Sequence, residues 1–248
     1  MKYTYTDEHS VIELESLERG NAEVDKLQVF VNSGRWTPKQ YSYELERRYR
    51  YIKARIPEQY WNLHLLDNIS RTIYSAISDY ESNLNRMVSY GLGFTFLGEG
   101  FKQTVMSLLA RDLCDLTKDK ELVVFVVTYV ELVYFFRQSW NDPLLKAELN
   151  NRFDVDFFFL VDIPSSDVTN YQILTELLAR LQLRIGYNLP TFLSVNVKAT
   201  SLNDILRDSF VGQIVFPFAS VNKPIVIDEI CNYDMLYERK WELADVKN

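Results

Sequence analysis

The fold is indicated most directly by residues 93–104, which read GFTFLGEGFKQT. The first five of these residues form a short, largely apolar run that predicts a buried strand. Two glycines then predict a turn, and VMSLLARDL at 105–113 has the spacing of an amphipathic helix. A turn between a strand and a helix presents backbone N–H groups and a helix N-terminus to an anion. We therefore predict a ligand-binding turn formed by Gly98, Gly100, Lys102, Gln103 and Thr104.

Further apolar runs and helical patterns follow this unit and alternate along the chain. The apolar runs lie at 122–127, 157–161, 191–195 and 224–227. The helical patterns lie at 129–140, 142–150, 170–187 and 201–208. Continuous apolar strands that alternate with helices are typical of a parallel sheet that is covered on both faces. The sequence therefore predicts an α/β fold in three layers, with helices on both sides of a mostly parallel sheet.

The N-terminal part of the chain has a different pattern. A short helix is expected from residue 11 to Gly20, followed by an apolar run at 27–31. Thr37 and Pro38 are expected to begin the next helix, because they suit the N-cap and the first helical position. A helix is also expected over 65–90. We interpret 1–45 as a small helical partner-binding segment, 46–235 as the main domain and 236–248 as a tail.

Composition argues against several classes of protein, a stand-alone DNA-binding protein among them. The chain has 248 residues and a net charge of −7, whereas a dedicated DNA-binding protein usually carries a basic surface. Cys114 and Cys231 lie far apart, which argues against a disulfide scaffold or a zinc site and fits a reducing compartment. The longest apolar run, at 122–136, contains polar residues and is too short to span a bilayer. We expect a soluble, cytoplasmic protein without a membrane segment.

One cluster of basic and aromatic residues lies within the helix that follows Pro38. Its basic members are Arg47, Arg48, Arg50, Lys53 and Arg55, interleaved with Tyr49 and Tyr51. Such a cluster can bind a nucleic-acid backbone, here single-stranded DNA. The favoured alternative is a solvated helix face whose arginines pair with Glu44 and Glu46.

Two further polar residues follow buried strands. Asp162 ends the run at 157–161, and Asn196 ends the run at 191–195. Ligands bind at the carboxyl ends of the strands in an open parallel sheet. A carboxylate in this place suits magnesium, and an amide can orient a water or contact a phosphate. The alternatives are that Asp162 starts a turn and that Asn196 caps a loop.

The order of these features resembles the DnaC/DnaI-type helicase loaders, which are AAA+ ATPases related to DnaA and to the transposon-encoded IstB proteins. The resemblance covers residues 48 to about 230. RYRYIKARIPEQY at 48–60 looks like the segment before their ATPase core, and 93–98 looks like their first strand and the opening of Walker A. Residues 157–163 resemble Walker B. Residues 184–196 resemble the Arg–Pro–Thr–sensor 1 segment, with Asn196 as the sensor.

The resemblance implies a set of roles and partners. It implies an AAA+ (P-loop NTPase-like) fold, ATP or ADP with Mg²⁺ as cofactor, and Thr104 and Asp162 on the metal side. It also implies a role in DNA replication, a replicative helicase or another helicase loader as partner, a homo- or hetero-oligomer, and a phage or mobile-element origin. Arg184 matches an arginine of the family, and a place on the helix surface is its alternative.

The chain departs from the family pattern in three places. A working Walker A motif reads GxxxxGK[ST], but this loop is one residue shorter. When it is aligned on Thr104, Gln103 occupies the lysine position and Lys102 the preceding glycine position. Only one acid, Asp162, remains in Walker B. The stretch 210–216 lacks an arginine finger, for which Arg207 is the nearest substitute.

Phosphoryl transfer depends on positioned cations and metal ions, so these losses together predict a pseudo-ATPase. The expected function is a helicase-loader-like adaptor or non-catalytic ring subunit. Two alternatives stay open. One is a divergent but active ATPase that uses Lys102 and Thr104, and the other is a regulatory or inhibitory binding protein on the same fold.

Overall fold

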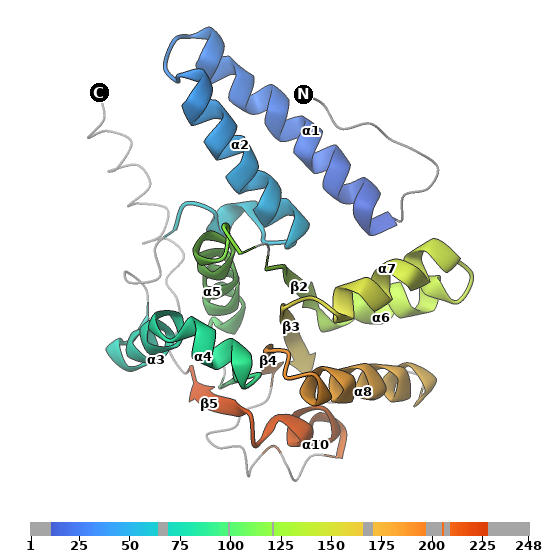
Figure 1. The fold of residues 1–248 in the computed structure, drawn as a ribbon. Helices are drawn as coiled ribbons and strands as arrows, with labels where there is room; N and C mark the ends of the chain where they lie inside the picture. Colours follow the sequence, from blue (N-terminus) through green and yellow to red (C-terminus); the bar gives the residue numbers. More distant parts are fainter. Residues whose placement is uncertain are drawn as a thin grey trace.

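A parallel sheet forms the centre of the molecule (Figure 1). The computed structural model describes residues 11–63, 69–98, 100–120, 122–165, 171–196, 205 and 209–227. The sheet has five strands in the order β2-β3-β4-β1-β5, and every pairing is parallel. The strands are β1 (Gly93–Leu97), β2 (Val124–Thr128), β3 (Phe157–Pro164), β4 (Thr191–Asn196) and β5 (Asn222–Val226). The predicted parallel sheet is confirmed.

Helices cover both faces of this sheet. On one face, Phe157 and Phe159 of β3 pack in a core with the apolar side chains of α5 (Lys102–Leu116). On the other face, Phe158 and Leu160 pack against four helices. These helices are α6 (Tyr129–Ser139), α7 (Pro143–Phe153), α8 (Tyr171–Gly186) and α10 (Ser209–Val215), and the short 3₁₀ helix η3 (Phe216–Phe218) follows α10. Because alternate strand residues face opposite sides, the phenylalanine run of β3 supplies both cores. The predicted three-layer α/β fold is confirmed.

The N-terminal part forms a helical hairpin that projects from the body (Figure 1). Its first helix, α1 (Val11–Asn32), is continuous, so the prediction that a helix ends at Gly20 is wrong. Val24 and Leu27 are buried, and this packing outweighs the cost of a glycine within a helix, which is about 1 kcal/mol. The second helix, α2 (Pro38–Lys53), begins as predicted with a capping box at Thr37. The domain boundary expected between residues 45 and 46 lies within α2.

The helix expected over 65–90 is interrupted. Residues 64–68 lie outside the described part of the chain, and the remainder forms α3 (Arg71–Ser82) and α4 (Leu84–Ser89). At the break, the side-chain amide of Asn83 donates a 2.9 Å hydrogen bond to the carbonyl of Asp79. Asparagine competes with helical hydrogen bonding in this way. Most of the helix expected at 201–208 also lies outside the described residues. Within the described ranges, no helix combines the length and the apolar character needed to cross a bilayer.

A partly buried carboxyl group on α3 makes the stability of the fold depend on pH. Burial raises the pKa of Glu81 to about 7, and Asp112 adds to this effect while Arg111 opposes it. The folded protein therefore binds this proton more tightly than the unfolded chain. The resulting stabilisation is fully present below the ordinary pKa of 4.5 and is lost as the pH rises through about 7.

Replacement of Glu81 by glutamine is expected to remove this loss. The variant should match the wild type in urea unfolding at pH 4 and should be more stable than the wild type at pH 8, because the charged carboxylate is then absent. Glu46→Gln is the control, since the Glu46 side chain is 73% exposed. Equal differences between Glu81→Gln and wild type at the two pH values would contradict the assignment.

Candidate functional site

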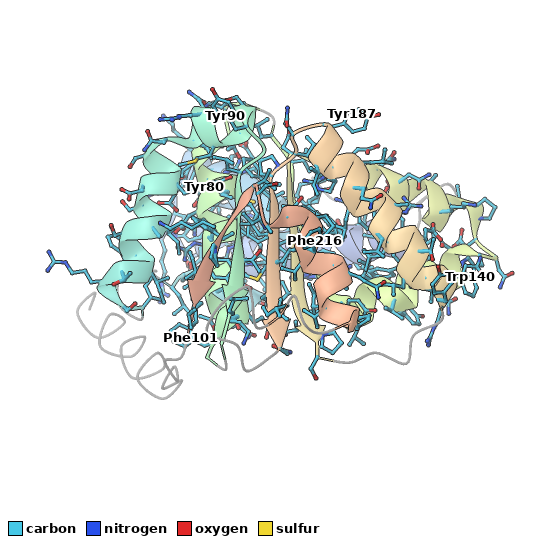
Figure 2. The ribbon with its side chains drawn as sticks, turned by 90° about the horizontal axis from the view of Figure 1, so that it is seen from below. Tyr80, Tyr90, Phe101, Trp140, Tyr187 and Phe216 are labelled. Carbon is cyan, nitrogen blue, oxygen red and sulfur yellow. The ribbon has the colours of Figure 1, made fainter. Side chains whose placement is uncertain are left out.

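The candidate site lies at the edge of the sheet where the strands end, and Figure 2 shows Phe101 at this edge, opposite Tyr90 and Tyr187. The chain leaves β1 at Gly98, whose φ of +91° favours glycine. The N–H of Gly100 donates a 2.7 Å hydrogen bond to the carbonyl of Ile227, and the N–H of Ile227 donates to Leu97 at 2.9 Å. The turn is thus held against the residue that follows β5, and one of its N–H groups already has a protein acceptor.

The side chain of Lys102 folds back into this turn. It is 4% exposed, and its ammonium donates hydrogen bonds to the carbonyl of Gly98 and, at 3.4 Å, to that of Gly100. A phosphate-binding loop instead points backbone N–H groups at its ligand. Two carbonyl oxygens therefore converge on a cation in a place where a phosphate would need donors. In this arrangement the turn binds its own lysine.

The two residues that follow Lys102 face other parts of the structure. Gln103 lines a pocket of about 230 Å³ that lies between α5 and the end of β2. Thr104 is buried, and its Oγ1 lies 3.5 Å from the hydroxyl of Tyr60. The sequence-predicted ligand set is therefore divided. Lys102 and the two glycines lie together, whereas Gln103 and Thr104 have other surroundings.

Asp162 lies at an irregularity of the sheet. The register between β3 and β4 shifts between Leu160 and Ile163, and Asp162 adopts a φ of +59°. Its N–H donates a 2.8 Å hydrogen bond to Oγ of Ser194. A non-glycine residue in this region of φ is uncommon and is often found at functional sites. A bulge of this kind re-aims a side chain at the end of a strand.

Lys102, Asp162 and Asn196 meet at this edge. Burial raises the pKa of Asp162 above its usual value, and the charge of Lys102 and a hydrogen bond with Asn196 partly offset that rise. The sequence places Asp162 and Asn196 after neighbouring buried strands, which predicts that they lie at the same side of the sheet. Ser194 and Tyr60 were not expected, because a serine inside a strand and a tyrosine before the core give no signal in the sequence.

In this structure the side chains of the site contact one another and the backbone of the turn. Mg²⁺ in phosphate sites is held by one or two carboxylates together with substrate oxygens. Here one carboxylate with a raised pKa lies beside a lysine that is bound to backbone carbonyls. No group of three or more histidine, cysteine or acidic side chains that could hold a metal occurs in the described part of the chain. The geometry is that of an internal polar contact at the sheet edge.

The basic cluster on α2 is paired with acidic side chains. Arg47 and Arg48 both contact Glu44, at 2.9 and 2.8 Å. Arg50 lies 3.0 Å from Glu46, and Arg48 also reaches Glu23 of α1 at 2.6 Å. Lys53 lies over the ring of Tyr49, 4.8 Å from its centroid. The expected pairing with Glu44 and Glu46 is confirmed, but the face is not solvated, since Arg48 is 18%, Glu44 14% and Glu23 4% exposed. Contact with single-stranded DNA stays a prediction.

Arg184 is fully buried, so the alternative of a helix-surface position is wrong. Its guanidinium donates hydrogen bonds to the carbonyls of Phe153 (2.6 Å), Val155 (2.7 Å) and Pro190 (2.7 Å) and to Oγ1 of Thr191 (2.9 Å). These acceptors lie just before β3 and at the start of β4, at the opposite edge from Asp162. Burial lowers the pKa of Arg184 to about 9. The side chain is a structural connection rather than part of the candidate site.

The finger candidate Arg207 lies outside the described residues. The stretch 210–216, in which the resemblance places an arginine finger, forms α10 and the start of η3. The described residues 209–227 contain no arginine. The role of Arg207 therefore stays a prediction.

Comparison with known proteins identifies the fold. No family model matches the chain, and no curated protein sequence matches it. Among solved structures, the DnaC helicase loader superposes with a TM-score of 0.57 at 18% identity, over 69% of this chain and 100% of that one. DnaI gives a TM-score of 0.51 at 20% identity, over 69% and 94% of the two chains.

A third solved structure agrees with these two. It is a protein from Streptococcus pyogenes serotype M3 that is described as a candidate primosome component, with a TM-score of 0.52 at 18% identity, over 71% of this chain and 91% of that one. At identities this low, the similarity shows a shared fold and does not show a shared activity. The chain has the parallel α/β fold of the DnaC helicase loader, DnaI and this streptococcal protein.

Proposed function

We propose that this chain is a cytoplasmic, helicase-loader-like protein of DNA replication that acts without hydrolysing ATP. The observation that carries the proposal is the turn after β1, where the ammonium of Lys102 is bound by the carbonyls of Gly98 and Gly100. The same turn carries Gln103 where a working P-loop carries its lysine. A loader fold with this turn supports a role as an adaptor, or as a non-catalytic subunit of a homo- or hetero-oligomeric ring.

The proposed partner is a replicative helicase or another helicase loader. Support comes from the solved DnaC structure, which is named as a helicase loader, and from the hairpin of α1 and α2. The two helices pack along their length, and the stacked rings of Phe30 and Trp36, with centroids 4.8 Å apart, hold the turn between them. Val29 of α1 is 63% exposed. Tyr43 of α2 is 55% exposed, and the ammonium of Lys118 lies over its ring. Exposed apolar and aromatic side chains of this hairpin are candidates for contact with a partner protein.

Capture of the helicase tests this proposal. The tagged protein is expected to capture the replicative helicase, or its loader, from the same source, equally well with and without Mg²⁺-ATP. The double variant Val29→Ser/Tyr43→Ser is expected to weaken capture by about tenfold or more, because exposed aromatic anchors dominate many interfaces.

A matched control lies on α6. Val130 and Tyr134 are 73% and 55% exposed, and Val130→Ser/Tyr134→Ser should leave capture unchanged. If neither helicase nor loader is captured, the regulatory-protein alternative replaces the loader proposal. If capture requires ATP, the active-ATPase alternative replaces the proposal that the protein acts without nucleotide.

A further inference from the structure

A pocket of about 230 Å³ lies beside the candidate site and is separate from it. Arg19 of α1, Arg55 after α2, and Gln103 and Ser107 of α5 contribute polar side chains to its wall. Thr128 and Glu131, at the start of α6, complete the polar part. Among the described residues, the lining of this pocket does not include Gly98, Gly100, Lys102, Asp162 or Asn196. The pocket and the turn after β1 therefore share α5, but different residues of that helix face each of them.

Ser107 gives the first sign that the pocket receives a polar ligand. Its side chain is 1% exposed, and its Oγ has no hydrogen-bond partner among the described residues. Burial of a hydroxyl without a hydrogen bond costs on the order of 1–3 kcal/mol. Buried hydroxyl groups normally have partners. A ligand with acceptor oxygens would give this hydroxyl its missing hydrogen bond.

The charges around the pocket give the second sign. Burial, followed by the charge of Arg55, lowers the pKa of Arg19, and the nearby acids Glu58, Glu15 and Glu23 do not cancel these effects. Arg19 and Arg55 both line this pocket, and their like charges oppose each other there. An anion between them would reduce this repulsion and accept charge-assisted hydrogen bonds, which are about twice as strong as neutral ones.

One carboxylate opposes an anion at this place. Glu131 accepts a 3.1 Å hydrogen bond from Arg55 and forms an ion pair with it. Arg55 also contacts Glu15 at 2.7 Å. Burial alone would raise the pKa of Glu131, but hydrogen bonds from Thr128 and the charge of Arg55 lower it, so this carboxylate is charged at neutral pH. Glu131 therefore competes with any anion for Arg55.

The size of the pocket limits the ligand. Pockets that bind drug-sized molecules and cofactors measure roughly 300–1,000 Å³, and this one is smaller. We propose that it binds one phosphate-sized oxyanion, held by Arg19 and Arg55 and by the hydroxyl of Ser107, with the amide of Gln103 at the rim. The oxyanion can be inorganic phosphate or the terminal phosphate of a larger molecule.

Calorimetric titration with sodium phosphate, at an ionic strength matched with sodium chloride, tests the proposal on the full chain. Wild type is expected to bind phosphate at one site. Arg19→Ala is expected to raise the dissociation constant about tenfold or more, because it removes a charge-assisted contact. Ser107→Ala should raise it about two- to tenfold, as expected for loss of a neutral hydrogen bond.

Glu131→Gln gives a test in the opposite direction. Glutamine keeps an acceptor at the third position of the capping box with Thr128 and removes the competing charge, so the dissociation constant should fall. Arg137→Ala, which removes an exposed arginine from the same helix, is the control and should leave phosphate binding unchanged. Repetition with ADP and ATP separates the two sources, since a nucleotide that uses this pocket shows the same dependence on Arg19 and Ser107.

Several results would overturn the proposal. They are the absence of heat beyond the chloride control, and phosphate binding that Arg19→Ala and Ser107→Ala leave unchanged. Weaker binding to Glu131→Gln would also overturn it. None of these outcomes depends on whether the protein hydrolyses ATP, so this proposal and the proposed function can fail separately.

Discussion

Replacement of Arg184 by alanine is expected to lower the free energy of unfolding by several kcal/mol, because each buried acceptor left without its donor costs on the order of 1–3 kcal/mol. This guanidinium donates hydrogen bonds to the carbonyls of Phe153, Val155 and Pro190. The bonds connect the end of α7 with the residues just before β3 and β4. Alanine would leave these three buried carbonyls without their donor. A loss of this size is a large part of the stability of an ordinary domain. Urea unfolding, followed by circular dichroism, measures the change.

Arg180, one turn earlier on α8, is the matched control. It is 14% exposed and pairs with Glu176 at 2.8 Å, an i,i+4 contact, and exposed pairs of this spacing contribute roughly 0.3–0.5 kcal/mol. Arg180→Ala also loses packing over Phe136 and Phe153, so a total loss of about 1 kcal/mol is expected. Equal effects of the two substitutions would contradict the structural role of Arg184.

The second large effect concerns ATP turnover. Purified protein with Mg²⁺-ATP is expected to turn over on the order of 10⁻³ s⁻¹ or slower, the level of a P-loop protein without its arginine finger. The reason is local. The ammonium of Lys102 is bound by the carbonyls of Gly98 and Gly100. Gln103 lines the pocket between α5 and β2 and not the turn. Asp162 is the only acid in β3. Release of labelled phosphate measures the rate.

Two substitutions act as controls for this expectation. Thr104→Ala and Asp162→Ala remove the residues that the family resemblance places on the metal. Because neither is arranged as a metal ligand here, both should leave the background rate unchanged. A rate that either substitution lowers would show that the turn rearranges around nucleotide, and the protein would then be a divergent ATPase.

The fold was predictable because the strands carry a strong signal. The run FFFLV at 157–161 is apolar at every position, which only a strand buried on both faces requires. The placing of Asp162 and Asn196 at one side of the sheet was predictable, since parallel strands bring their carboxyl ends together. The predicted end of the strand at Asp162 was two residues early, because β3 continues to Pro164. Tertiary packing, not local pattern, determined the rest. The continuity of α1 through Gly20 depends on Val24 and Leu27 being buried.

The arrangement of the side chains at the site could not be predicted from the sequence. The sequence shows that Lys102 stands one position before the expected lysine, but it does not show that the ammonium is bound by two carbonyls of its own turn. The sequence also gives no sign of the positive φ of Asp162 or of the burial of Arg184, because both follow from contacts with residues distant along the chain. The pocket between Arg19 and Ser107 joins residues 88 positions apart, and no local motif signals it.

We propose that this protein engages its partner without nucleotide turnover. Release of labelled phosphate from ATP, measured in the same sample in which the replicative helicase or its loader is captured, tests this proposal. We expect capture of the partner, with phosphate release no faster than the background rate of the protein alone. Phosphate release that rises when the partner is added, and that Thr104→Ala abolishes, would contradict it.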